Sequence, residues 1–201
     1  MDSVPEASAA ILAGGQGRRL GHDKGAILLG GRPLLTRVAE RLAPLTDDLT
    51  VVLRAGQELP ISGPWRIVHE GALCGGLLAG LVAALEGAQH ELVWVVGCDM
   101  PFISAALLCY ERTVIGDSDV AMPRVPLGLE PLHALYRRQA VASIRALAAS
   151  GERRLSALSL GLSVRCIDLE ELPPAGDPLR PFFNINTASD LARAERLLAD
   201  R

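Results

Sequence analysis

Short apolar runs of five or six residues recur along the chain, and each has the length of a strand buried on both faces. These runs lie at Ala9–Ala13, Leu49–Leu53, Trp65–His69, Leu92–Gly97 and Val164–Leu169. Segments with apolar residues at helical spacing separate them. The predicted helices cover Leu34–Leu42, Gly76–Leu85, Ser104–Arg112, Arg137–Ala149 and Ala188–Leu198.

This alternation of strands and helices predicts an α/β protein. Strands joined by right-handed β-α-β crossovers form a mostly parallel, Rossmann-like sheet with helices on both faces. A chain of 201 residues has the length of a single domain. We expect residues 1–201 to form that domain, with a short disordered tail over about residues 1–8. Such sheets bind ligands at the carboxyl ends of their strands, so functional residues are expected just after strands.

Composition and charge exclude several classes of function. The formal net charge of -3 argues against binding to nucleic acid, which requires many cationic side chains to neutralise phosphates. No apolar run approaches the roughly 18 residues of a membrane span. The opening residues Met1–Ala10 also lack the basic and apolar regions of a signal peptide. We therefore expect a cytoplasmic protein that binds neither nucleic acid nor membrane.

The four cysteines are scattered along the chain, without a C-x-x-C pair or nearby histidines. This pattern predicts buried, reduced thiols and indicates neither a zinc site nor a redox motif. The cysteines are Cys74, Cys98, Cys109 and Cys166.

A glycine-rich, basic segment follows the first predicted strand. Glycines allow backbone N–H groups to approach a phosphate closely, and neighbouring cationic side chains neutralise the remaining oxygens. We expect this segment to bind the phosphates of a nucleotide. The residues concerned are Leu12, Ala13, Gly14, Gly15, Gln16, Gly17, Arg18, Arg19 and Lys24.

Two common phosphate loops do not fit this segment. In a Walker loop the lysine is followed by Ser or Thr, whereas Lys24 is followed by Gly25. The dinucleotide fingerprint needs a third glycine where Leu20 stands, and an acidic residue after the second strand where Arg54 stands. The segment is therefore a third kind of phosphate loop.

The longer pattern of the segment resembles a known family. It reads Leu12-Ala-Gly-Gly-x-x-x-Arg19-Leu20-Gly21-x-Asp23-Lys24, with Gly31-x-Pro33-Leu34 after it. This is similar to the signature loop of nucleotidyltransferases of the molybdenum cofactor guanylyltransferase type. The resemblance implies that Arg19 and Lys24 hold the phosphates of the nucleotide during catalysis. A glycine-rich turn with solvated basic side chains is the alternative interpretation.

Asp99 follows the strand Leu92–Gly97 within the run Gly97-Cys-Asp-Met-Pro101. The resemblance implies that Asp99 is catalytic, contacts the nucleotide and binds Mg²⁺, which prefers oxygen ligands shared between carboxylates and phosphates. The alternative is an aspartate that caps the following helix. Gly75–Leu81 resembles a helix start that lies beside the nucleotide in the family, which makes Gly80 a nucleotide-binding candidate. Gly75 and Gly76 could equally be turn residues before a core helix. Glu70, which stands near a position where the family often has aspartate, is a further nucleotide-binding candidate.

Three later segments extend the resemblance to about Leu191. The segment around His133 resembles one that approaches the acceptor substrate, although a hydrogen-bonded structural histidine is the alternative. Arg153 and Arg154 could bind an anionic acceptor or lie on a solvated surface. Asn184 and Asn186 are also candidates for binding the acceptor. They could touch the metal site through water, or cap the last helix, for which Thr187 is itself a good cap.

The resemblance implies transfer of GMP from GTP to the phosphate of molybdopterin or Mo-molybdopterin, with Mg²⁺ as cofactor and pyrophosphate as product. A molybdenum insertase and a molybdoenzyme chaperone are the protein partners it implies. A cytidylyltransferase of the same cofactor pathway and a sugar-phosphate nucleotidyltransferase have the same kind of site and remain alternatives. A non-catalytic nucleotide-binding module is a further alternative, of a different class.

Overall fold

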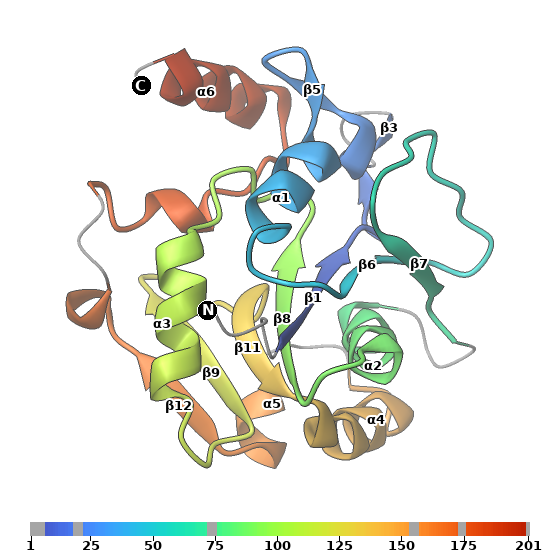
Figure 1. Ribbon diagram of the computed structural model, residues 1–201, viewed down its shortest axis with the longest axis vertical. Coiled ribbons are helices and arrows are strands. Elements are labelled where there is room, and N and C mark those ends of the chain that lie inside the picture. The colour runs from blue at the N-terminus through green and yellow to red at the C-terminus, as the bar shows by residue number, and fades with distance from the viewer. Residues whose placement is uncertain (1–6, 18–21, 72–75, 153–156, 173–175, 200–201) are drawn as a thin grey trace.

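A twisted central sheet organises the computed structural model, which describes residues 7–17, 22–71, 76–152, 157–172 and 176–199 (Figure 1). The strands lie in the order β10-β9-β11-β8-β1-β6-β7, and β12 pairs with β9. Their bounds are β1 Ala7–Leu12, β6 Leu49–Leu53, β7 Arg66–His69, β8 Leu92–Gly97, β9 Val120–Val125, β10 Gly128–Leu129, β11 His133–Arg137 and β12 Val164–Ile167.

Four neighbouring strands of this sheet run parallel. β1 pairs in parallel with β6 on one side and with β8 on the other, and β6 pairs in parallel with β7. On the other side of β8, β11 pairs antiparallel with both β8 and β9. The mostly parallel, Rossmann-like sheet predicted from the sequence is therefore confirmed. The carboxyl ends of β1, β6, β7 and β8 meet at one edge of the sheet.

Helices cover both faces of the sheet, as predicted. In β1, Ala9 and Ile11 point into one apolar cluster, whereas Ala10 and Leu12 point into a second one. The first cluster includes α1 and α3, and the second includes α2 and α4. Because a strand alternates its side chains between faces, a fully apolar strand must be buried on both. The helices are α1 Leu34–Leu42, α2 Leu77–Gly87, α3 Ala105–Val114, α4 Val141–Ala149, α5 Leu158–Gly161 and α6 Ala188–Ala199.

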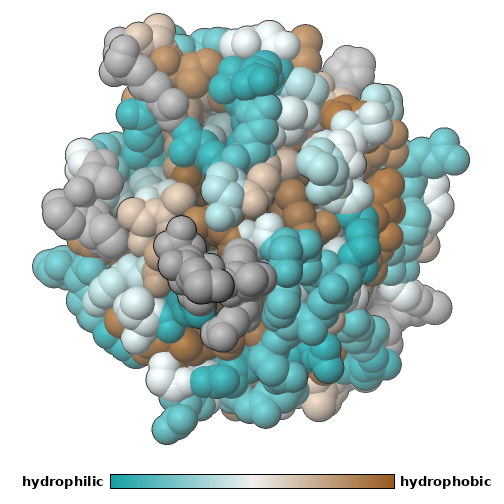
Figure 2. Space-filling view, in the orientation of Figure 1, coloured by the Kyte–Doolittle hydropathy of each residue, from teal (hydrophilic) through white to brown (hydrophobic). Residues whose placement is uncertain are grey.

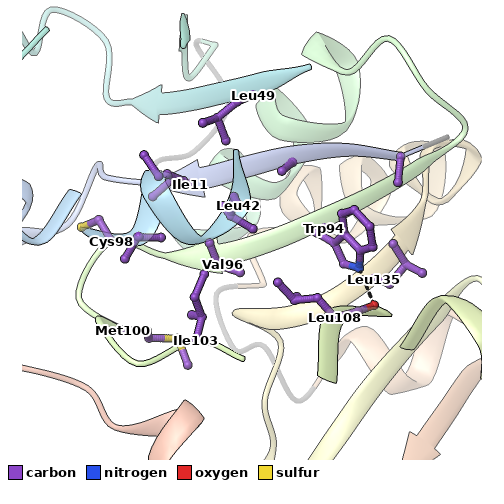
Figure 3. Packing of buried hydrophobic residues seen from close by; sticks show 14 of the residues in the cluster. Ile11, Leu42, Leu49, Trp94, Val96, Cys98, Met100, Ile103, Leu108 and Leu135 are labelled. Atoms are coloured by element: carbon purple, nitrogen blue, oxygen red, sulfur yellow. Dashed lines mark hydrogen bonds between the residues drawn. The ribbon is translucent and has the colours of Figure 1, made fainter. Parts of the chain in front are cut away.

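Figure 3 shows the packing of the first cluster around Ile11 and Trp94. Trp94 is almost fully buried, and its indole Nε1 donates to the backbone oxygen of Leu108 at 2.9 Å. This bond satisfies the single polar atom of the ring inside the apolar layer, so α3 is fixed to the sheet by packing and by a hydrogen bond.

Short elements at the carboxyl edge of the sheet lie between β1 and α1. They are β2 Gln16–Gly17 paired with β3 His22–Asp23, a 3-10 turn at Lys24–Ala26, and β4 Leu28–Leu29 paired with β5 Arg32–Pro33. α6 packs over this region through a third apolar cluster that includes Leu29, Phe102 and Ala194. This packing brings the last part of the chain close to the segment after β1.

Several boundaries differ from those expected. β1 begins at Ala7, and both Ala7 and Ser8 are buried, so the predicted tail over about residues 1–8 was wrong for these two residues. The predicted helix Arg137–Ala149 begins only at Val141, because Arg137 ends β11 and a 3-10 turn intervenes.

The burial of two strands and of the thiols also differs from the burial predicted from the sequence. The strands β7 and β12 are partly exposed and not buried on both faces, because they lie at the borders of the sheet. Only Cys98 among the described cysteines is buried, whereas Cys109 is exposed and Cys166 lies between these extremes; all three are free thiols. The fourth, Cys74, lies outside the described residues.

Within the described residues, no helix is long and apolar enough to cross a membrane. The face of the molecule in Figure 2 carries hydrophilic residues over most of its area, with smaller apolar areas between them.

Candidate active site

A cleft of about 280 Å³ lies at the carboxyl ends of the parallel strands. It contains residues that directly follow β1, β6, β7 and β8, as expected for ligand sites in sheets of this kind. Six of the site residues predicted from the sequence line it, with others from the segments that carry the resemblance, whereas Arg54 was not predicted. The lining residues are Leu12, Gly14, Gly15, Lys24, Arg54, Glu70, Gly76, Leu77, Gly97, Cys98, Asp99 and Leu132.

The backbone after β1 comes close to neighbouring side chains at Gly14. A Cβ atom at this position would lie 2.8 Å from Glu70 Oε1 and 3.0 Å from Arg54 Cγ, so a larger residue would displace both side chains. Gly97 has a similar role beside Asp99, whose Oδ1 would lie 2.7 Å from an added Cβ. The two glycines therefore allow the segments after β1 and β8 to approach the cleft closely.

Lys24 and Asp99, which line the cleft, meet the exposed residue Asn186, although the three are far apart in the sequence. Lys24 Nζ donates to Asp99 Oδ2 at 2.7 Å and to Asn186 Oδ1 at 2.5 Å. The side chains of Lys24 and Asp99 are only 17% and 14% exposed. Two oxygen atoms thus converge on one cation here. A carboxylate and an amide oxygen are also the ligands that Mg²⁺ prefers, so the donor set fits such a metal.

The backbone of the last loop brings Asn186 to Asp99. The N–H of Ile185 donates to the backbone oxygen of Asp99 at 3.0 Å. One residue beyond Asn186, Thr187 caps α6 by accepting from the N–H of Asp190, and Asp190 Oδ2 accepts from the N–H groups of Asn186 and Thr187. This reciprocal cap confirms the predicted role of Thr187 and fixes the loop.

Asn184 takes a different direction from Asn186. Its side-chain nitrogen donates to the backbone oxygen of Phe182 at 3.2 Å.

The alternative role of Asp99 as a helix cap can also be settled, because Ser104 caps α3 by accepting from the N–H of Leu107. The side chain of Asp99 is instead engaged by Lys24.

Glu70 and Arg54 form the side of the cleft next to Gly14. Burial raises the pKa of Glu70, and the positive charge of Arg54 partly offsets that effect. The Nε atom of Arg54 is buried and has no hydrogen-bond partner among the described residues. Gly80 of α2 packs against this side, because a Cβ there would lie 3.4 Å from Glu70 Oε1 and 3.3 Å from Leu12.

Gln57 is a residue of the site region that the sequence reasoning missed. Its side chain accepts from the N–H of Arg54 at 3.2 Å and donates to the backbone oxygen of Ala13 at 3.1 Å. It also donates to Asp23 Oδ1, next to Lys24, at 3.3 Å. Gln57 therefore joins the ends of β1 and β6 to the segment that carries Lys24. Its position just after a predicted strand was the available signal.

His133 is fully buried at the start of β11. Its Nδ1 lies 2.9 Å from Glu111 Oε1, and its Nε2 accepts from the N–H of Ser104 at 3.3 Å, so both ring nitrogens are engaged within the protein. Because Nε2 is an acceptor, Nδ1 carries the proton that is donated to Glu111. Burial raises the pKa of Glu111 to about 7, against the opposing effect of His133. This geometry fits the structural alternative for His133.

Some predicted site residues cannot be placed. Arg18, Arg19, Arg153 and Arg154 lie outside the described residues, so their roles stay predictions. Gln16 and Gly17 form β2, beside the cleft residue Gly15 in the chain. Ala13 is buried, and its carbonyl group, which accepts from Gln57, takes part in fixing the end of β1.

Fold and site together define a class of protein. A glycine-rich segment, a partly buried lysine and an aspartate meet at the carboxyl edge of a parallel sheet, which is where such folds bind phosphorylated ligands. The arrangement is that of an α/β protein with a cleft suited to the phosphates of a nucleotide.

Comparison with known families makes this class more specific. Residues 9–164 match the model of the MobA-like NTP transferase domain. The chain belongs to this family, which confirms the resemblance found in the sequence.

Relatives of the family are similar over nearly the whole chain. The molybdenum cofactor guanylyltransferase of Desulfosudis oleivorans is 34% identical and covers 97% of this chain and 96% of its own length. The enzyme of the same name from Rhizobium meliloti is 34% identical, over 94% of this chain and 91% of its own.

Solved structures share the fold. The molybdopterin-guanine dinucleotide biosynthesis protein A of Archaeoglobus fulgidus superposes with a TM-score of 0.84, at 28% identity over 96% of this chain and 100% of its own. A 2-C-methyl-D-erythritol 4-phosphate cytidylyltransferase from Thermus thermophilus has a TM-score of 0.73 at 22% identity, over 96% of this chain and 99% of its own. Because the second structure is that of a cytidylyltransferase, the fold by itself does not select the base.

Proposed function

We propose that this protein is a molybdenum cofactor guanylyltransferase, which transfers GMP from GTP to the terminal phosphate of molybdopterin or Mo-molybdopterin. The full-length similarity to enzymes of that name supports the reaction and its substrates. The observation that carries the proposal in the structure is the meeting of Asn186 with Lys24 and Asp99, two residues that line the cleft beside the glycine-rich segment.

The reaction requires little acid-base chemistry from the protein. An oxygen of the acceptor phosphate forms a bond to the α-phosphorus of GTP, and the bond from that phosphorus to the bridging oxygen breaks. The electron pair leaves with pyrophosphate. Because the attacking group is already an anion at neutral pH, the protein has to orient two phosphates and neutralise their charge.

The residues of the cleft divide these tasks. The backbone from Leu12 to Gly15 and the ammonium group of Lys24 bind the phosphates that leave as pyrophosphate. Asp99 and Asn186 would hold Mg²⁺, which supplies charge neutralisation at the phosphates when it is bound. Glu70 and Arg54, which line the same cleft next to Gly14, would contact the nucleotide.

Measurement of pyrophosphate release tests the proposal. The purified protein is mixed with each of the four ribonucleoside triphosphates and Mg²⁺, with and without molybdopterin. We expect release from GTP that requires molybdopterin, and a GMP adduct of the acceptor detected by mass spectrometry. Release from CTP instead would identify the cytidylyltransferase alternative, and no release with any nucleotide would favour a binding module.

A Lys24→Ala variant ties the activity to the site. It should lose nearly all turnover and keep the fold, because the ammonium group lies over the cleft and outside the three apolar clusters. Wild-type turnover in this variant would contradict the proposal.

A further inference from the structure

The ammonium group of Lys24 occupies the position between the two oxygens that would bind a metal. Lys24 Nζ lies 2.7 Å from Asp99 Oδ2 and 2.5 Å from Asn186 Oδ1. The ammonium group thus bridges the pair of oxygens that a divalent ion would bridge. A divalent ion that bound there would have to displace the ammonium group, and the two positive charges would repel each other in a site that is only partly solvated.

The protein supplies few other ligands for a metal. Among the described residues, no group of three or more His, Cys, Asp or Glu side chains could hold an ion. Ions such as Mg²⁺ and Mn²⁺ are six-coordinate and fill the positions that the protein leaves open with phosphate oxygens and water. A metal at Asp99 and Asn186 would therefore take several of its ligands from the nucleotide.

The side chain of Lys24 is suited to leave the oxygens of Asp99 and Asn186 and to bind phosphate oxygens in their place. It is the only lysine of the chain, and the other nineteen basic residues are arginines. A lysine carries a compact charge with rotatable donors on a flexible stem, whereas the arginine fork is planar and rigid. The stem of Lys24 passes Gly15, since a Cβ at Gly15 would lie 3.8 Å from Lys24 Cδ. Its ammonium group is thus close to the segment that would bind phosphates.

From these observations we propose that Lys24 couples metal binding to nucleotide binding. In the free protein its ammonium group takes the place of the metal and excludes free divalent cations from Asp99 and Asn186. A triphosphate draws the ammonium group away and supplies the missing oxygens, so metal and triphosphate bind together. By linkage, each strengthens the binding of the other by the same factor. The inference rests on the metal-nucleotide site of the proposed function, but neither on guanine nor on molybdopterin.

Titration with Mn²⁺ in the absence of nucleotide tests the exclusion. Electron paramagnetic resonance is used to count bound Mn²⁺ in the wild-type protein and in a Lys24→Met variant, which keeps an unbranched stem without the charge. We expect Lys24→Met to bind free Mn²⁺ at least tenfold more tightly than the wild type. Adding Asp99→Asn to Lys24→Met should abolish this gain, which would locate the ion.

A matched control distinguishes occupancy of the two oxygens by Lys24 from a general effect of positive charge in the cleft. Arg54→Met removes another positive charge that lines the same cleft, at a residue whose side chain makes no hydrogen bond to Asp99 or Asn186 in the described part of the structure. It should change the affinity for free Mn²⁺ less than threefold. Equal affinities of wild type and Lys24→Met, with both variants folded by circular dichroism, would overturn the proposal. A gain in Arg54→Met as large as that in Lys24→Met would overturn it too.

The single lysine also permits a direct measurement of the exchange. Labelling with lysine enriched in ¹³C at the ε carbon gives one ε-methylene signal, that of Lys24, in the NMR spectrum. Mg²⁺ alone should leave the signal in place, whereas Mg²⁺ with inorganic tripolyphosphate should shift it. The same shift with Mg²⁺ alone would contradict the coupling. Neither experiment uses GTP or an acceptor, so a failure of the proposed function would leave both results unchanged.

Discussion

The two ends of the parallel strands each carry an aspartate, and the two aspartates have opposite surroundings. Asp48 lies at the amino ends, where it accepts from Ser8 Oγ at 2.6 Å, from the N–H of Gln89 at 2.9 Å and from Arg66 Nε at 3.1 Å. Asp99 lies at the carboxyl ends, beside a cleft, and is held by Lys24.

The two aspartates differ in whether a ligand could replace their hydrogen-bond partners. The partners of Asp48 are a buried hydroxyl, a backbone amide and an arginine that also donates to the backbone oxygen of Gly87. Such a network fixes strands, because both carboxylate oxygens of Asp48 accept hydrogen bonds from the protein. Lys24 is a single flexible side chain, which in the exchange proposed above a ligand draws away. The same residue type is therefore structural at one edge of the sheet and available for chemistry at the other.

The same substitution at both aspartates gives the sharpest test of this comparison. Asp99→Asn should lower the rate of GMP transfer by about 100- to 1,000-fold, the usual effect of removing one group that stabilises charge in a transition state. Its thermal unfolding should stay close to that of the wild type. Steady-state kinetics and calorimetry measure the two effects. Activity above a tenth of the wild-type rate would place the metal-binding role elsewhere.

Asp48→Asn should have the opposite effect, a loss of stability without a loss of activity. It removes the charge paired with Arg66 and leaves one of several converging donors without an acceptor, which should cost about 2 kcal/mol of the free energy of unfolding. For a domain of this size, the midpoint of thermal unfolding should fall by roughly 4–8 °C. The activity per folded molecule should be unchanged, and a loss of kcat comparable to that of Asp99→Asn would refute the assignment of separate roles.

Gln57→Ala should have a smaller effect, on nucleotide binding. It removes the bonds to Ala13, Arg54 and Asp23, so the segment that carries Lys24 loses a support outside the reacting groups. We expect KM for the nucleotide to rise up to about tenfold, with a smaller change in kcat. Gln89→Ala is the control at the opposite edge, where the contacts to Asp48 and Ser8 use the backbone amide alone. An equal rise in KM in both variants would show that Gln57 has no specific role.

The dependence of stability on pH should show the smallest effect. Burial opposes the ionisation of Asp48, but hydrogen bonds from Ser8, Arg66 and Gln89 outweigh it and lower the pKa below its ordinary value of 3.8. An acid with a lowered pKa stabilises the fold above its ordinary pKa, and this contribution is lost as the pH falls through the lowered value. Urea unfolding should therefore give a constant difference between wild type and Asp48→Asn above about pH 5. Below about pH 4 the difference should shrink, and an unchanged difference at pH 2.5 would argue against the shift.

Local patterns in the sequence determined much of the fold. The helix Leu34–Leu42 was predicted with its observed bounds, and the strands Leu49–Leu53 and Leu92–Gly97 likewise. Strong apolar periodicity is a local property, so it can be read without knowing the neighbours. The strand β9 was missed because Pro123 and Arg124 interrupt its apolar run. The strand β11 was missed because its residues were interpreted as a motif and as the start of a helix.

The glycine-rich segment, Lys24 and Asp99 could be predicted as site residues because each follows an apolar strand or belongs to a recognisable pattern. The tertiary structure alone decided three other features. It made β7 an exposed border strand, since the border of a sheet depends on strand order. It buried His133 against Glu111, and it placed Asn186 on the ammonium group of Lys24 across 162 positions of sequence. Contacts of this range arise from chain topology and packing, which no local pattern of residues contains.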